Sequence, residues 1–337
     1  MTETTPDDAN ANAGTPASGD DSILPFQLDG AGMRGRVARL DRTLNAILGA
    51  RAYPTPVAAL VSEATLLTAL IGQTMKLRWR LSLQVRGEGA IRLIATDYFA
   101  PEREGGPARI RAYAGFDPEA LDPAAPGFRQ LGAGVVGVTI DQGPGMAPYQ
   151  GVTPLTGGAL SGAMEAYFAQ SEQLATSFAI ETALSETPGE AAAWRGGGVM
   201  IQQLPSEGGV APDAPAGADG LMSAGDAAAL GGREDDWRRV SMLLATMETH
   251  ELIGPIVPAE TLLLRLFHEE APRVWPAQPV RFGCTCSAEK VEAALAHYSA
   301  AEIAEMITAE GKITADCQFC GASYALDPSR ILGGGEA

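Results

Sequence analysis

Four cysteines near the C-terminus constrain the fold of this chain more than any other feature. They form two close pairs, Cys284-Thr-Cys286 and Cys317-Gln-Phe-Cys320, separated by 30 residues, and the 283 residues before the first pair contain no cysteine. Two close pairs can supply four thiolates to one tetrahedral ion, and zinc best suits a closed four-sulfur site. The pattern therefore predicts zinc binding in the reduced state. Two local disulfides or four incidental thiols are the alternatives, and a zinc site and disulfides could also be two states of one switch.

The composition limits the classes of protein to which the chain can belong. Its 337 residues suffice for about two domains, and 46% of them are hydrophobic, as in globular proteins. The net charge of −17 opposes nucleic-acid binding, because phosphates require a basic surface. The sequence shows neither a secretory signal nor an apolar run of about 18 residues that could span a bilayer. We therefore expect a cytoplasmic protein without nucleic-acid or membrane partners, in a reducing compartment that keeps the thiols free.

Changes in composition along the chain predict five segments. An acidic N-terminal segment has too few apolar residues to fold, so we expect a disordered tail. A later stretch rich in Ala, Gly, Pro and Asp predicts a flexible insert. The predicted boundaries are 1–22 for the tail, 23–205 for the core, 206–232 for the insert, 233–280 for a helical linker and 281–337 for a zinc module.

The core is predicted to have an α+β fold, with a mixed sheet built from hairpins and intervening helices. Alternating and β-branched segments indicate the strands, and apolar residues at helical spacing indicate the helices. The expected strands are Leu81–Val85, Ala90–Ala95, Gly137–Ile140, Tyr149–Leu155 and Val199–Leu204; the expected helices are Val57–Thr74 and Gly162–Gln173, with a strand passing into a helix at Arg34–Leu48.

The segment Gly132–Gly137 matches the GxGxxG pattern of dinucleotide sites. Such a site needs a strand before the motif and a helix after it. Here prolines precede the motif and β-branched residues follow it. We therefore predict a glycine-rich turn that enters a strand.

Helical periodicity resumes after the insert. Two amphipathic helices are predicted, one opening at Asp235 and one beginning near Pro258. Their apolar faces consist of Trp237, Val240, Leu243, Leu244 and Met247 in the first, and of Leu262, Leu263, Leu266 and Phe267 in the second.

The zinc module is predicted to hold two helices and a hairpin. Ser287 can cap the first helix, and Ser299-Ala-Ala-Glu302 has the pattern of a capping box for the second, which Gly311 would end. Cys317–Cys320 would form the turn of the hairpin. Because the module is small, bound zinc would contribute much of its folding free energy.

Three other functions are compatible with a four-cysteine module. A zinc-ribbon nucleic-acid binder is disfavoured, because the residues from Arg281 onward include four Lys or Arg and eight Asp or Glu, a net charge of −4. A dithiol oxidoreductase would use Cys317 and Cys320, but its motif normally lies at a helix N-terminus after a strand. A structural zinc module in an interaction protein would keep its metal under oxidant.

The cysteine block resembles that of the heat shock protein 33 family. The resemblance lies in Phe282–Ser287, Glu289, Val291, Cys317–Gly321 and Tyr324, and extends over residues 23–330. The matching core segments are Arg34-Gly35, Tyr53-Pro54, Glu63–Lys76, Gln84–Gly89, Tyr149–Gly151, Tyr167–Thr176 with Ser171–Gln173, Gly197–Pro205 and Leu264–Glu270. The acidic tail and the long insert depart from the family in their extent.

The resemblance implies a redox-regulated chaperone and no catalytic centre. In this family the reduced, zinc-bound protein is a poor chaperone, and oxidation under unfolding conditions makes it an ATP-independent holdase. By carry-over, Cys284, Cys286, Cys317 and Cys320 would bind one zinc. On oxidation Cys284 would pair with Cys286 and Cys317 with Cys320, and the zinc would be released. The expected partners are unfolded or oxidatively damaged client proteins and, on activation, a second copy of the chain.

The amphipathic linker suggests how oxidation could expose a binding surface. We infer that it docks on the core in the resting state and detaches when the module loses zinc and unfolds. Detachment would expose apolar surface on both the linker and the core, and such surface can hold unfolding proteins.

Overall fold

The computed structural model describes residues 20–186, 192–204 and 224–332. The predicted tail up to residue 19 and the insert up to residue 223 lie outside these ranges. The end of the tail prediction is wrong, because Asp20 forms an ion pair with Arg195 at 2.9 Å and Ser22 begins a strand. Asp21 also accepts hydrogen bonds from the backbone N–H groups of residues 41–43. The ordered core therefore begins slightly earlier than predicted.

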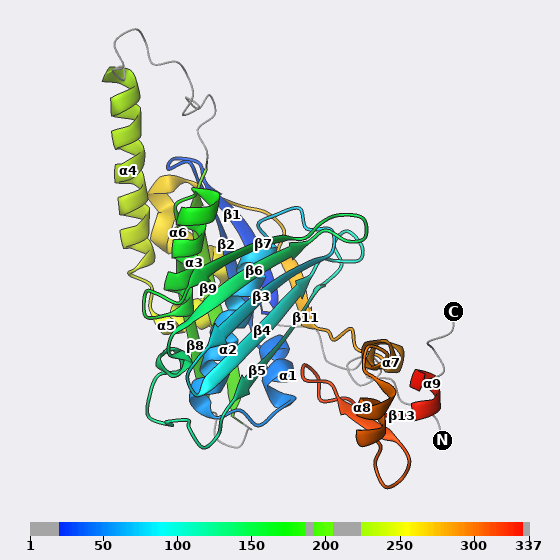
Figure 1. Cartoon of the computed structure of the whole chain (residues 1–337). Coiled ribbons are helices and arrows are strands. Elements are labelled where there is room, and N and C mark those ends of the chain that lie inside the picture. The colour runs from blue at the N-terminus through cyan, green and yellow to red at the C-terminus, as the bar shows by residue number, and fades with distance from the viewer. Residues whose placement is uncertain (1–19, 187–191, 205–223, 333–337) are drawn as a thin grey trace.

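Within the described residues, eleven strands form one mixed sheet (Figure 1). Ten of them run in the order β7-β6-β3-β4-β5-β11-β1-β2-β9-β8, and β10 pairs with β1. The described ladders are antiparallel except that of β11 with β5, which is parallel. The strands are β1 (Ser22–Leu28), β2 (Met33–Leu40), β3 (Arg80–Gly87), β4 (Ile91–Phe99), β5 (Ala108–Phe116), β6 (Gly134–Asp141), β7 (Tyr149–Pro154), β8 (Thr176–Ser185), β9 (Ala193–Gln203), β10 (Pro272–Val274) and β11 (Gln278–Phe282).

One face of the sheet packs against α1 (Arg42–Gly49), α2 (Thr55–Gly72) and α3 (Leu160–Tyr167), which form the main core with it. Helix α2 is apolar on nearly all sides because it lies in the centre of this core. It is also long and apolar enough to cross a bilayer by length and composition, contrary to the prediction, but 78% of that window is buried in the fold. Burial of this kind is what a core helix requires.

The other face, over β1, β2 and β9, is covered by α4 (Ala224–Leu244), α5 (Thr249–Ile253) and α6 (Ala259–Phe267). Alternation along β9 divides the two cores: Met200 packs in the first, and its neighbours Val199 and Ile201 pack in the second. The apolar helix faces predicted from the sequence point into this second core. Its linker members are Trp237, Val240, Leu243, Leu244, Met247, Leu252, Val257, Ala259, Leu262, Leu263, Leu266 and Phe267.

Two predictions about the linker are corrected. Helix α4 begins at Ala224, so residues 224–232 are helical where a flexible loop was expected. Alanine favours helix strongly, and its frequency here outweighs the glycines on which the loop prediction relied. The predicted linker is also not wholly helical, because β10 and the start of β11 lie within it. Strands of three and five residues carry too little periodicity to be recognised in the sequence.

The strands and helices expected in the core are present, with longer bounds in most cases. The hairpin of β3 and β4, the pair β6–β7 and the passage from β2 into α1 are confirmed. Gly132 has a φ of +65° and leads into β6, so the predicted glycine turn before a strand is also confirmed. Strands β1, β5 and β8 were not predicted from the sequence. Three short helical turns complete the described part of the core and linker: η2 (Gly127–Leu131), η3 (Phe168–Glu172) and η4 (His268–Glu270).

The C-terminal module consists of α7 (Ala288–Leu295), α8 (Ala300–Glu305), β12 (Ile313–Asp316), β13 (Ser323–Leu326) and α9 (Pro328–Leu332). Ser287 caps α7 and the capping box of Ser299 and Glu302 begins α8, as predicted. Helix α8 already ends at Glu305, so Gly311 does not end it and instead lies in the turn before β12. The buried core of the module is small: Ile303, Ile313, Leu326 and Ile331.

Candidate metal centre

Two structural elements bring the cysteine pairs together. Strand β11 runs parallel to β5, and the N–H of Gly283 donates to the carbonyl oxygen of Ile110 at 3.0 Å, which directs the following Cys284 and Cys286 along β5. Cys317 and Cys320 lie in the turn between β12 and β13. This turn is closed by a hydrogen bond from the N–H of Gly321, with a φ of +72°, to the carbonyl oxygen of Cys317 at 2.9 Å. The hairpin with the second pair at its tip is therefore confirmed.

The four sulfur atoms form one cluster in which every Sγ lies within 4.8 Å of the others. The Sγ atoms of Cys284 and Cys317 are 3.6 Å apart, and those of Cys286 and Cys320 are 3.4 Å apart. A tetrahedral site with metal–sulfur bonds of about 2.3 Å places its sulfurs about 3.8 Å from one another. The cluster could therefore hold a metal ion, and it is the only such group of His, Cys, Asp or Glu in the part of the chain that the structure describes.

Two side chains outside the cysteine pairs contact the sulfurs. The hydroxyl of Tyr324 donates to Cys286 Sγ at 3.0 Å. The Arg111 guanidinium donates to Cys284 Sγ at 3.6 Å and to the Thr285 hydroxyl at 3.3 Å. Tyr324 entered the sequence analysis only through the family resemblance, and Arg111 was missed, because it is distant in sequence and lies on an unpredicted strand. Groups of this kind orient metal ligands and stabilise their charge.

The surroundings make the thiols unequal. Burial opposes ionisation of Cys284, but the N–H of Cys286 and the Arg111 guanidinium outweigh it and lower the pKa of Cys284 to about 7. Burial raises the pKa of Cys286 and that of Cys320. A coordinated metal would deprotonate all four thiols. Because the thiolate is the form that reacts with oxidants, the centre is chemically suited to oxidation.

Arg111 is held by a short ladder of polar residues across three strands. Ser82 on β3 lies opposite Asp97 on β4, and Asp97 lies opposite Arg111 on β5. Ser82 donates to Asp97 at 2.5 Å, and Asp97 accepts from Arg111 at 2.6 and 2.7 Å. Burial alone would lower the pKa of Arg111, but Asp97 raises it above its ordinary value. The guanidinium therefore remains charged beside the sulfurs.

Aromatic and polar contacts also join the module to the core. Phe319, between Cys317 and Cys320, lies under the Arg111 guanidinium at 3.9 Å from ring centroid to Cζ. Tyr113 meets the same ring edge-on, with the ring centroids 4.9 Å apart. Arg51 donates to the carbonyl and side-chain oxygens of Gln318 at 3.1 and 2.8 Å. In Figure 1 the module accordingly lies beside α1 and the end of β11.

A recess of about 360 Å³ opens beside the cluster. Four of its lining side chains are cationic, and the lining includes no carboxylate. The residues are Trp79, Arg80, Phe99, Arg109, Arg111, Thr285, Cys286 and Lys290. Cys286 forms part of its wall, so the recess adjoins the cysteine cluster.

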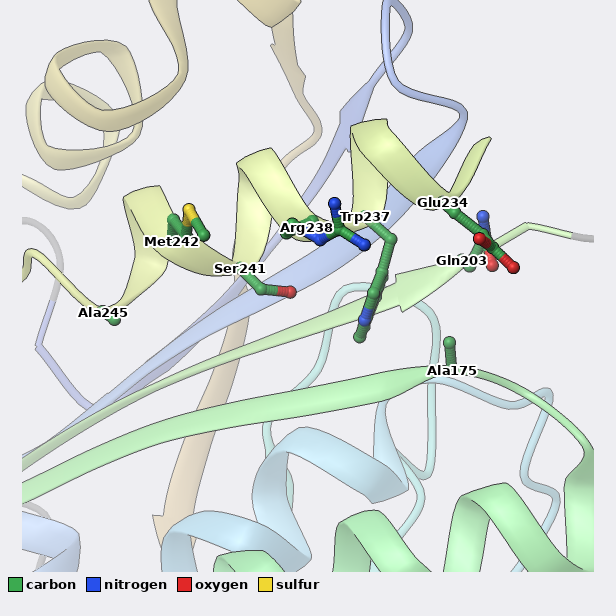
Figure 2. A pocket seen from close by; sticks show the side chains of 8 residues that line it. All are labelled: Ala175, Gln203, Glu234, Trp237, Arg238, Ser241, Met242 and Ala245. Atoms are coloured by element: carbon green, nitrogen blue, oxygen red, sulfur yellow. The ribbon is translucent and has the colours of Figure 1, made fainter. Parts of the chain in front are cut away.

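A second groove, of about 600 Å³, lies elsewhere in the described part of the chain. Figure 2 shows it between α4 and the sheet, where Ala175 precedes β8 and Gln203 ends β9, with Trp237 pointing into it. Helix α4 and the cysteine module occupy opposite sides of the molecule in Figure 1. The groove thus belongs to the contact between the linker and the sheet, and takes no part in the cysteine chemistry.

The structure weighs against a thioredoxin-like reading of Cys317 and Cys320. The pair lies in a hairpin turn and is followed by β13. A dithiol catalyst of that kind places its first cysteine at a helix N-terminus, which lowers the thiol pKa. Here both pairs instead share one sulfur cluster.

Comparison with known proteins gives a consistent result. The family model described as Hsp33 protein matches residues 21–327. The 33 kDa chaperonin of Caulobacter vibrioides is 38% identical over 315 residues, which cover 92% of this chain and 95% of that protein. The 33 kDa chaperonin of Ectopseudomonas mendocina is 33% identical, with coverage of 91% and 92%.

A solved structure shares the fold. The crystal structure of the 33 kDa chaperonin (heat shock protein 33 homolog) from Thermotoga maritima matches with a TM-score of 0.71 and 19% identity, covering 93% of this chain and 97% of that one. The α+β fold with a C-terminal four-cysteine module is thereby confirmed. With the family model matching nearly the whole chain, this protein belongs to the Hsp33 family of chaperones.

Proposed function

We propose that this protein is a redox-regulated, ATP-independent holdase that binds unfolding or oxidatively damaged proteins and prevents their aggregation. It acts in the cytoplasm as a binding protein without a catalytic centre. Its reduced form holds one zinc ion through Cys284, Cys286, Cys317 and Cys320 and is inactive. The observation that carries the proposal is the four-sulfur cluster packed directly against the core of a chaperone-family fold.

Oxidation would convert the cluster into two disulfides, Cys284–Cys286 and Cys317–Cys320. With a peroxide as oxidant, two thiolates give up two electrons to form each sulfur–sulfur bond, and the peroxide O–O bond breaks to give two hydroxide ions. Two peroxide molecules thus oxidise four thiolates. Both pairs of ligands are then lost, so a bound metal has no remaining site and the small module loses its principal source of stability.

The linker helices are suited to act as the switch. They cover apolar residues of the sheet, and among the residues buried beneath them are Leu24, Phe26, Val37, Val199 and Ile201. Release of α4–α6 would expose this face together with the apolar faces of the helices. Large exposed apolar surfaces bind other unfolded chains, and a second copy of the activated protein could associate through the same kind of surface.

Polar contacts hold the end of α5 against the sheet. Arg39 donates to the carbonyl oxygens of Leu252 and Glu251 at 3.0 and 2.7 Å, at the C-terminal end of α5. Gly197 permits this close approach, because a Cβ there would lie 2.2 Å from the Leu252 carbonyl oxygen.

The test is light scattering by a client unfolded with heat or denaturant. Reduced, zinc-loaded protein should not suppress the scattering, whereas protein oxidised by peroxide under mild unfolding conditions should. Oxidation should also release about one zinc per chain, and reductant with zinc should restore the inactive form. If neither form suppresses scattering, the holdase proposal fails; turnover in an insulin-reduction assay would then indicate a dithiol oxidoreductase, and zinc retained under oxidant a structural module.

A further inference from the structure

Arg111 is a core residue that contacts a cysteine of the first pair and the turn that carries the second pair. Its guanidinium donates to Cys284 Sγ in the first pair and lies over the ring of Phe319 in the second. Asp97 holds it from the other side through hydrogen bonds of 2.6 and 2.7 Å. The Arg111 and Asp97 side chains are only 12% and 9% exposed, so solvent screens these interactions weakly.

Oxidation changes the charge that Arg111 faces. Four thiolates and one divalent metal ion carry a net charge of −2, whereas two disulfides carry none. Before oxidation the guanidinium therefore interacts with an anion on each side, Asp97 and the sulfur cluster. After oxidation Asp97 alone neutralises it, and the electrostatic attraction between Arg111 and the sulfur cluster is lost.

We propose that Arg111 docks the reduced module on the core and that loss of this charge-dependent contact on oxidation releases the module from the core. Arg111 thus acts as a positioning residue, and the strength of its contact depends on the charge of the sulfur cluster. The inference rests on the redox function proposed above and adds the physical step between the cysteines and the rest of the fold.

Strand β11 provides a direct route from this contact to the linker. The N–H of Gly283, next to Cys284, donates to the carbonyl oxygen of Ile110, next to Arg111. The pairing of β11 with β5 covers only three residues before this bond. The chain between α6 and Cys284 contains β10 and β11. A module that moves away from the core would therefore pull on β11, and through β10 on the end of α6.

The exchange rate of the Gly283 amide proton measures the docked state without reference to chaperone activity. In wild type we expect slow exchange in the reduced, zinc-loaded protein and faster exchange after oxidation. The decisive quantity is the ratio of the oxidised to the reduced rate. Replacing Arg111 alone would leave Asp97 buried and unpaired, so the test variant is the double substitution Asp97→Asn with Arg111→Gln.

In the reduced, zinc-loaded double variant we expect Gly283 to exchange about tenfold faster than in wild type, because a charged hydrogen bond is lost. The ratio should fall toward one, while about one zinc per chain remains bound. Arg111→Lys keeps the positive charge, so its ratio of oxidised to reduced exchange rates should lie between that of wild type and one. Arg51→Gln is the matched control: it removes the neutral contacts to Gln318 and should affect both redox forms alike.

A wild-type ratio in the zinc-loaded double variant would overturn the inference. If that variant did not fold, Phe319→Leu would replace it, because it removes the ring beneath the guanidinium and leaves the buried pair intact. It should speed exchange of reduced Gly283 by about threefold. Tyr113→Leu, which removes the edge contact to the same ring and leaves the guanidinium over it, should change the rate less, and equal rates in the two variants would refute the role of Arg111. Failure of oxidised wild type to suppress client aggregation would instead refute the holdase function, whatever the exchange ratio.

Discussion

Replacing Phe267 with alanine should activate the reduced protein in part. Phe267 ends α6, is fully buried and stacks on Phe26 of β1 with ring centroids 6.2 Å apart and planes at 18°. Truncating a buried phenylalanine costs about 3–5 kcal/mol. Because this ring packs between the linker and the sheet, the loss applies to the docked linker and hardly at all to the detached one. A change of about 3 kcal/mol shifts the docking equilibrium more than a hundredfold.

The assay compares reduced, zinc-loaded Phe267→Ala with wild type at equal zinc content. We expect faster amide exchange throughout α4–α6, increased binding of an apolar dye and partial suppression of client light scattering without oxidant. Leu264→Ala is the control, because Leu264 lies on the same helix and is 60% exposed. If Phe267→Ala lowers the melting temperature of the whole protein but leaves exchange of α4–α6 and dye binding unchanged, the linker is not a separable switch and the reasoning is refuted.

Three further predictions concern the metal, the ion pair of the buried Glu270 carboxylate, and pH. Cys317→Ser should reduce bound zinc from about one per chain to near zero, as measured by elemental analysis; full retention would contradict four-sulfur ligation. Arg239→Met should lower the free energy of unfolding in urea by about 1–3 kcal/mol, because it leaves the buried Glu270 carboxylate, now 2.7 Å from the guanidinium, without its charged partner. Asp236→Asn, which alters only the more exposed partner of Arg239, should have a much smaller effect, and equal losses would argue against this explanation. Burial raises the pKa of Glu63, so its protonated form is favoured by folding; its contribution to stability is complete below the ordinary pKa and is lost as the pH rises through the raised one. Glu63→Gln should therefore flatten the dependence of stability on pH above that ordinary value, and an unchanged slope in urea titrations would exclude Glu63 as its source.

The features that depend on short stretches of chain could be predicted from the amino-acid sequence. The spacing of Cys284, Cys286, Cys317 and Cys320 was sufficient to predict one sulfur cluster, since close pairs on short turns can meet around one ion. The caps at Ser287 and Ser299 and the apolar faces of the linker helices could also be predicted, because each depends on a few neighbouring residues. The start of α4 at Ala224 and the end of α8 before Gly311 were predicted wrongly, because short stretches of sequence there favour both helix and turn.

The contact between the module and the core depends on strand pairing and could not be predicted from the sequence. Ser82, Asp97 and Arg111 are distant in sequence and become neighbours through the register of three strands, which depends on pairing along the whole sheet. The parallel insertion of β11 beside β5 then places Cys284 next to Arg111. A buried charge pair gives no periodic signal, and a five-residue strand gives almost none. The sulfur cluster is therefore encoded locally, whereas its contact with the rest of the protein arises from long-range strand pairing.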